Sequence, residues 1–387
     1  MKRAVSVVLA LVFVLVFFAA CAGGNTQSPS APSGSTSTPP PAASGGGPSG
    51  GQPNNSGGGA SSGNTLDSWD FSKDKTFNFA WANYLNDTNV VSYMLTDFRN
   101  YLYDITEGTI DITLYNSASL VPESEGADSV RDGMADFCNW PFSYSAGTMP
   151  IGNMVALPGV AWNNNQAATY AINEWYKTLN ADEVKDYHLL GAYGVGNGVY
   201  MTTKAIRSVD DFVNTQIRCM GGQAAVMSAY QAIPVAMPIG EVYEALRTGV
   251  VQGCYVTIVT SYTNKLHEVV KFVTWDPYFL SALCFLMNQD SWNSLSEGQK
   301  AAMDDAAMYL VDLAAYVMDG QAVQAYDLCV EAGVEFITFS DEDYKKMSEM
   351  SAPVLTEYIA DLDSKGYDAS GAMAFIRELA EKYNAIY

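Results

Sequence analysis

The chain is poor in basic residues and in histidine. Its 387 residues include 20 lysines and arginines, 42 aspartates and glutamates, and only 2 histidines. The resulting formal net charge of −22 argues against nucleic acid or an anionic membrane face as a partner, because both repel an acidic surface. A small anionic ligand is not excluded, since a binding site depends on local charge.

The sequence also lacks the motifs of common catalytic and metal sites. It contains no HExxH, no zinc-type spacing of cysteine and histidine, no P-loop and no Gly-x-Ser-x-Gly. We therefore expect no catalytic residue, no cofactor and no metal. The run Gly194-x-Gly196-x-Gly198 resembles half of a dinucleotide fingerprint, but no helix pattern follows it. The Asn197-Gly198 pair favours a turn there instead.

Cysteine is sparse and irregularly spaced. Five cysteines follow Cys21, an odd number, and none of them form a CxxC pair. This pattern favours small buried apolar side chains over a disulfide framework. The residues are Cys138, Cys219, Cys254, Cys284 and Cys329.

The N-terminal segment has the pattern of an exported protein. Lys2 and Arg3 precede an uncharged apolar run that ends in Ala19-Ala20-Cys21. This predicts a signal peptide over 1–20. The junction resembles the lipobox of bacterial lipoproteins, which implies a lipidated Cys21 and attachment to the extracytoplasmic face of the cell membrane. An uncleaved anchor is the alternative. Residues 21–70, rich in Gly, Ser and Pro, are expected to form a disordered tether.

The remaining residues alternate between strand and helix patterns. Over 76–140 the order is strand, helix, strand, helix, strand, which predicts an open parallel α/β sheet. Two further strands are expected at 187–193 and 198–203, and a long helix at about 297–330. Helices are also expected after 341, with breaks near Pro353 and Gly366.

Arg218 ends a strand within a second alternating series, 215–253. Ligands bind at the carboxyl ends of strands in open α/β sheets. A guanidinium at this position can bind a carboxylate through a bidentate pair of hydrogen bonds. The alternative is an ion pair with one of the many acidic side chains of the protein.

Several motifs resemble one family. They are Thr106-x-Gly108-x-Ile110-x-Ile112, Val130-x-x-Gly133-x-x-Asp136, the block Glu241–Gly253, and Lys265-x-x-Glu268-Val269-x-Lys271. These residues resemble the solute receptors of tripartite ATP-independent periplasmic (TRAP) transporters, over about residues 75–385. The resemblance implies capture of a small organic acid and its delivery to a permease driven by a cation gradient. A ligand sensor for a membrane signalling partner, the receptor of an ATP-driven importer and a tethered hydrolase are alternatives.

The resemblance also implies an α/β, two-lobe fold of the periplasmic-binding-protein type. Open mixed sheets flanked by helices are expected, with a hinge cleft and a long helix that crosses both lobes. We expect lobe 1 to comprise 71–195 and 283–321, and lobe 2 to comprise 196–282 and 322–387.

In that family, the arginine that matches Arg218 forms a salt bridge with the ligand carboxylate. Two features of this sequence depart from the family pattern. A ligand-contacting asparagine aligns with Val256, and a second arginine of many acid-binding members aligns near Gly198. Because only one cation is expected in the pocket, we expect the ligand to be a monocarboxylate with an apolar or aromatic body and not a dicarboxylate.

Other candidate ligand contacts follow strand ends or match family positions near the cleft. For each aromatic residue the alternative is packing in the core. The candidates are Trp81, Asn83, Trp140, Tyr144, Trp162, Ile239, Tyr243, Tyr255 and Val256.

Overall fold

The computed structural model describes residues 69–145, 147–179 and 182–387. The predicted signal peptide, Cys21 and nearly all of the predicted tether lie outside these residues. Within the described ranges, no helix is both long enough and apolar enough to cross a bilayer.

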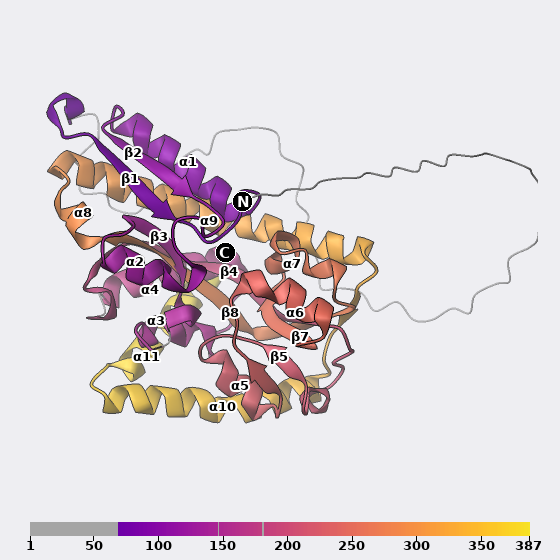
Figure 1. Ribbon diagram of the computed structural model, residues 1–387. Helices are drawn as coiled ribbons and strands as arrows, with labels where there is room; N and C mark the ends of the chain where they lie inside the picture. The colour runs from indigo at the N-terminus through magenta and orange to yellow at the C-terminus, as the bar shows by residue number, and fades with distance from the viewer. Residues whose placement is uncertain (1–68, 146, 180–181) are drawn as a thin grey trace, which may run out of the picture. The chain divides into compact units, whose positions relative to one another are not determined.

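The first alternating series folds as predicted into parallel strands and helices. Strand β1 lies between β2 and β3 and is parallel to both (Figure 1). The elements are β1 (Phe77–Ala82), α1 (Val90–Ile105), β2 (Ile110–Tyr115), α2 (Gly126–Arg131) and β3 (Phe137–Pro141).

The second series, which contains Arg218, also forms parallel strands. Strand β5 lies between β6 and β7, so its carboxyl end is flanked by two neighbours on the same edge. The elements are β5 (Gln216–Arg218), α5 (Gln223–Ala229), β6 (Ile233–Val235), α6 (Val242–Thr248), β7 (Gly253–Thr257) and α7 (Val259–Thr263).

Two long antiparallel strands join the two series into one mixed sheet. They are β4 (Tyr187–Thr202) and β8 (Phe272–Asn288), and the order is β2-β1-β3-β8-β4-β7-β5-β6, with β9 (Glu335–Ile337) beside β8. Strand β8 pairs with β3 of the first series, β4 pairs with β7 of the second, and β4 and β8 pair with each other. They are therefore the sheet connections between the two ends of the fold.

The predicted turn at 197–198 is wrong, because β4 continues through the glycine-rich run. The pairing with β8 is irregular here: β4 has one extra residue between Gly194 and Asn197, and β8 has extra residues between Leu280 and Asp276, opposite Asn197 and Gly198. Gly196 has φ +77°, a conformation that side chains disfavour. At Gly198, an added Cβ would lie 2.3 Å from a ring carbon of Phe279. The glycines thus allow the strand to bulge at Gly196 and to pack closely against Phe279 at Gly198.

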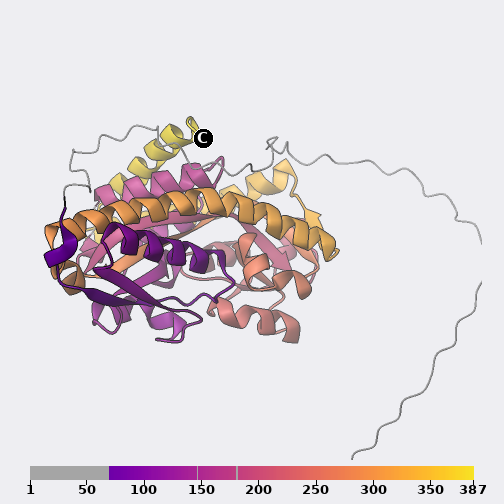
Figure 2. The same ribbon diagram turned by 90° about the horizontal axis from the view of Figure 1, so that it is seen from above.

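Helix α9 (Glu297–Glu331) is the predicted long helix. It begins at a capping box formed by Ser296 and Gln299, and packs against α1 and α7 at the two ends of the fold (Figure 2). Together with the mixed sheet, this confirms the predicted fold class.

The remaining helices cover the sheet and its lower edge in Figure 1. They are α3 (Pro150–Asn153), α4 (Asn165–Leu179), α8 (Gln289–Asn293), α10 (Asp341–Ser364) and α11 (Ala369–Asn384). Helix α10 packs against α5, whereas α11 packs against α4, so the C-terminal helices contact elements of both predicted lobes.

The predicted break near Pro353 is wrong, and the one near Gly366 is confirmed. Helix α10 continues through Pro353, which is exposed, so water can hydrate the carbonyl that loses its hydrogen bond. The helix ends at Ser364, two residues before Gly366, whose φ is +93°.

The five cysteines of the described residues are all buried and unpaired, as expected. Burial raises the pKa of each thiol, most simply at Cys138, where it is the sole cause. They are apolar packing groups in the core.

Candidate ligand-binding site

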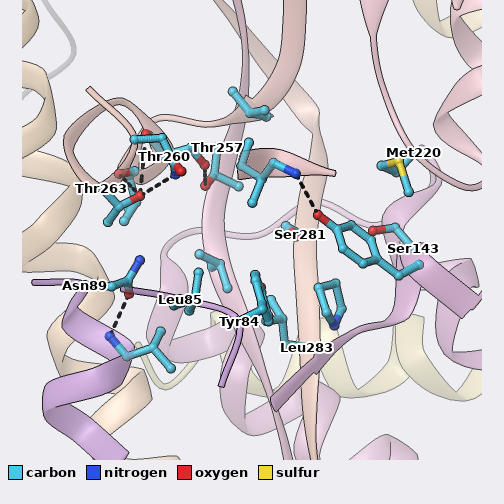
Figure 3. A pocket seen from close by; sticks show the side chains of 18 of the residues that line it. Tyr84, Leu85, Asn89, Ser143, Met220, Thr257, Thr260, Thr263, Ser281 and Leu283 are labelled. Carbon is cyan, nitrogen blue, oxygen red and sulfur yellow. Dashed lines mark hydrogen bonds between the residues drawn. The ribbon is translucent and has the colours of Figure 1, made fainter. Parts of the chain in front are cut away.

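A cavity of about 110 Å³ lies at the carboxyl ends of β1, β5 and β7. By the same measure one ordered water needs roughly 10–15 Å³, so the space suits a small organic molecule. We call one side the β1–β4 wall, which includes Tyr84, Asn89, Tyr144 and Tyr193. The opposite side, the β5–β7 wall, includes Arg218, Met220, Ile239, Tyr255, Val256, Thr257 and Thr260. Figure 3 shows labelled members of both walls around the same space.

Among the described residues that line this cavity, Arg218 is the one charged side chain. It ends β5 and is only 5% exposed. Its Nε donates to the carbonyl of Met237 at 2.9 Å. Within the described residues no carboxylate lies within ion-pair distance of it, unlike Arg99, which pairs with Asp111 at 2.7 Å. A buried cation without a carboxylate partner is costly, so this site favours an anion.

A hydrogen-bonded group connects the two walls near Tyr144. The Tyr144 hydroxyl donates to Glu123 Oε1 at 2.6 Å. The backbone N–H of Ile239, on the β5–β7 wall, donates to the same oxygen at 3.3 Å and to the Tyr144 hydroxyl at 3.2 Å. Burial raises the pKa of Tyr144, so this hydroxyl stays a neutral donor. The contact holds the walls together beside Arg218.

Tyr255 presents its ring to the cavity while its hydroxyl points into the protein. That hydroxyl and the hydroxyl of Tyr200 both donate to Asp276 Oδ2, and Asp276 Oδ1 accepts the N–H of Tyr278 at 2.8 Å. Asp276 is 2% exposed, and burial raises its pKa although these bonds act in the opposite direction. The ring of Tyr200 stacks on that of Tyr255 at 4.4 Å. Tyr255 is therefore a fixed aromatic surface.

The structure brings five of the predicted site residues to this cavity. Arg218, Ile239, Tyr255 and Val256 lie on one wall, and Tyr144 lies on the other. Arg218 and Tyr255 come from neighbouring parallel strands, and Tyr144 comes from the 3-10 turn after β3.

Two predicted residues from the first strand lie in the core instead. Trp81 is fully buried and donates to Asn139 Oδ1 at 3.2 Å. Asn83 uses its amide nitrogen to bind Ser92 and Asn116, each at 2.8 Å. Trp81 is therefore used in core packing, and Asn83 holds the loop after β1.

The other three predicted residues also lie away from the cavity. Trp140 is 3% exposed, and its indole N–H donates to Ser145 at 2.6 Å. Trp162 packs against the core in the loop before α4. Tyr243 is on α6, and its hydroxyl donates to Glu268 at 2.9 Å. The polar groups of Trp140 and Tyr243 thus have partners within the protein.

Sequence reasoning missed several residues of the β1–β4 wall. Tyr84 lies two residues beyond the end of β1, and Tyr193 lies within β4. Asn89 caps α1 by accepting the N–H of Val91 at 2.9 Å. The position of Tyr84 just after a predicted strand could have marked it as a candidate ligand contact. Nothing in the sequence distinguished Tyr193 from the other tyrosines.

In the described residues, no group of three or more His, Cys, Asp or Glu side chains is placed to hold a metal ion.

Comparison with known proteins assigns the family. The model of "Bacterial extracellular solute-binding protein, family 7" matches residues 81–361, more than half of the 387 residues. The chain belongs to this family, whose members are the solute receptors of TRAP transporters. Its similar curated relatives are binding proteins of transport systems, and many are periplasmic.

Individual relatives are distant but cover most of the chain. The ectoine-binding periplasmic protein TeaA of Halomonas elongata is 23% identical over 75% of this chain and 87% of its own length. A TRAP solute-binding protein of Rhodoferax ferrireducens, solved with copurified benzoate, has a TM-score of 0.75 at 20% identity, over 80% of this chain and 99% of that one. A marine metagenome TRAP protein, solved with 3-hydroxybenzoate, has a TM-score of 0.74 at 24% identity over the same shares.

Proposed function

We propose that this protein captures a small monocarboxylate with an apolar or aromatic body and delivers it to a TRAP permease. The observation that carries the proposal is Arg218, a buried guanidinium with no carboxylate partner in the described residues. Its remaining N–H groups suit the two oxygens of a ligand carboxylate.

The rest of the cavity supports one anionic group and no more. Apart from Arg218 the described lining residues are uncharged, and the β5–β7 wall includes the apolar or aromatic Ile239, Tyr255 and Val256. A second carboxylate would enter this space without a second cation and would lose its hydration. Aromatic acids bound by two structural neighbours are consistent with this chemistry.

The test combines identification of the ligand with direct binding. Native mass spectrometry of the purified protein should detect a copurified monocarboxylate. Calorimetry should then give a lower Kd for benzoate or phenylacetate than for succinate or malate. Tight binding of the dicarboxylates with no binding of monocarboxylates would reject the proposed ligand class.

We also propose a two-lobe closure around this ligand. The lobes we propose are 71–195 with 283–321, and 196–282 with 322–387. The predicted boundary on β4 falls within its irregular segment, which supports a flexible crossing there. A ligand that touches both walls has higher affinity for the closed state and shifts the population towards it. Small-angle scattering with and without ligand tests closure.

The lipid anchor remains a separate proposal. We propose that Cys21, the first residue after the predicted signal peptide, is lipidated and holds the protein on the extracytoplasmic face of the membrane. Mass spectrometry of the membrane fraction should find an N-terminal diacylated Cys21. Recovery of Cys21→Ala in the soluble exported fraction is expected.

A further inference from the structure

One tyrosine of the cavity has a buried hydroxyl without a partner. Tyr193 lies on β4, lines the cavity and is fully buried. No hydrogen-bonding group in the described part of the chain reaches its hydroxyl oxygen. Its ring stacks on Phe285 at 4.7 Å with an interplanar angle of 11°, which fixes the ring orientation. The hydroxyl is therefore held in one place.

Two other tyrosine hydroxyls of the same cavity behave differently. Tyr144 donates to Glu123, and Tyr255 donates to Asp276. A buried hydroxyl without a partner costs free energy, and natural proteins rarely leave one unpaired. Since protein groups satisfy its neighbours, the partner of the Tyr193 hydroxyl must come from the contents of the cavity.

Tyr193 and Arg218 come from different strands and lie on opposite walls of the cavity. Tyr193 is on β4, opposite Leu283 of β8, whereas Arg218 ends β5, and β7 lies between β4 and β5 in the sheet. When Arg218 holds the ligand carboxylate, the Tyr193 hydroxyl therefore faces a different part of the same ligand.

We propose that Tyr193 is a second polar anchor that selects ligands with an oxygen on the body, apart from the carboxylate. A phenolic hydroxyl both donates and accepts, so a ligand hydroxyl, ether or carbonyl oxygen satisfies it. A purely hydrocarbon body leaves it unpaired. This inference rests on the proposed function, because it assumes that Arg218 holds the carboxylate. It adds the class of acid: a monocarboxylate oxygenated at a second position.

The experiment measures a preference within matched probe pairs. Calorimetry on the full-length protein compares benzoate with 3-hydroxybenzoate, and phenylacetate with 3-hydroxyphenylacetate and with mandelate. The wild type should bind at least one oxygenated acid about 3- to 10-fold more tightly than its parent, the range expected for one neutral hydrogen bond. In Tyr193→Phe the ratio should fall to about 1, while the Kd of the parent acid stays the same.

A matched control separates this role from general damage. Tyr200 is buried and donates to Asp276 but does not line the cavity. Tyr200→Phe should keep the wild-type preference. An unchanged preference in Tyr193→Phe, or no preference in the wild type, overturns the inference. If Tyr193→Phe does not fold, the inference is tested on the wild type alone: a preference for the oxygenated acid supports it, and no preference overturns it.

Failure of the proposed function gives a different result. In that case no acid in the set binds to the wild type, or Arg218→Ala binds the parent acids as tightly as the wild type does. Either outcome rejects the carboxylate site and the second anchor together. Parent acids that bind through Arg218 without an oxygen preference reject only the second anchor.

Discussion

The two walls of the cavity differ in charge. The β5–β7 wall carries the buried Arg218, whereas the β1–β4 wall contributes neutral groups such as Tyr84, Asn89 and Tyr193. The difference teaches how recognition is divided. In the proposed complex, one wall would bind the ligand carboxylate through a charge-assisted contact, and the other would contact the rest of the ligand through neutral hydrogen bonds and ring faces.

The largest effect should come from removing the charge of one wall. Arg218→Ala leaves the ligand carboxylate desolvated and without its partner, so binding should weaken by about 2–5 kcal/mol, or roughly 30-fold to several thousand-fold. Calorimetry with benzoate or the copurified acid measures this. Arg218→Lys should recover only part of the loss, because a lysine cannot make a bidentate contact.

A matched arginine controls for net charge. Arg377 is exposed on α11, where its Nε donates to the carbonyl of Gly159 at 3.2 Å, and it does not line the cavity. Arg377→Ala removes the same charge and should leave the affinity within about twofold of wild type. Wild-type affinity in Arg218→Ala would show that the β5–β7 wall does not hold an anion.

The next effect concerns support behind the β5–β7 wall. Tyr255→Phe removes one of the hydrogen bonds that Asp276 Oδ2 accepts and leaves a fully buried carboxyl less satisfied. The free energy of unfolding should fall by about 1–3 kcal/mol, measured by urea denaturation. Tyr200→Phe removes the other bond and should cost a similar amount. If neither change lowered the free energy of unfolding, the Asp276 group would not stabilise the wall.

The Asp276 group should also make stability depend on pH. Its folded-state pKa is raised by burial, so the native protein binds its proton more tightly than the unfolded chain. Its contribution is therefore fully present below the unfolded pKa of about 3.9 and is lost as pH rises through the folded pKa. Asp276→Asn lacks this dependence. Denaturation should show a larger stability gap between wild type and variant at pH 4 than at pH 8.

The β5–β7 wall was more predictable from the sequence than the β1–β4 wall. Arg218 stood out because cations are scarce and because it ends a strand in an alternating series. Ile239 and Val256 followed from positions in the Glu241–Gly253 neighbourhood, the most specific part of the resemblance. The order of strands and helices was also predictable, because local sequence patterns determine it.

The features that were not predictable depend on tertiary packing. The Gly194–Gly198 run has turn chemistry, but pairing with β8, and with β7 at Gly198, keeps it in a strand. Trp81 lies within β1 and Tyr84 lies just after it, and only the sheet geometry decides which of them faces the core. An unpartnered hydroxyl such as that of Tyr193 can be recognised only when its neighbours are known.

The smallest expected effect concerns the contact that joins the walls. Glu123 accepts from Tyr144 on its own side and from the Ile239 N–H across the cavity. Glu123→Gln keeps an acceptor but removes its charge, so each bond weakens and the closed state loses about 0.5–1 kcal/mol. Affinity for benzoate should fall about two- to fivefold, because less of the protein is closed before binding. Glu125→Gln removes the same charge from an exposed neighbour and should leave affinity unchanged. Equal effects of the two variants would mean that general electrostatics, and not this contact, couples the charged wall to the neutral one.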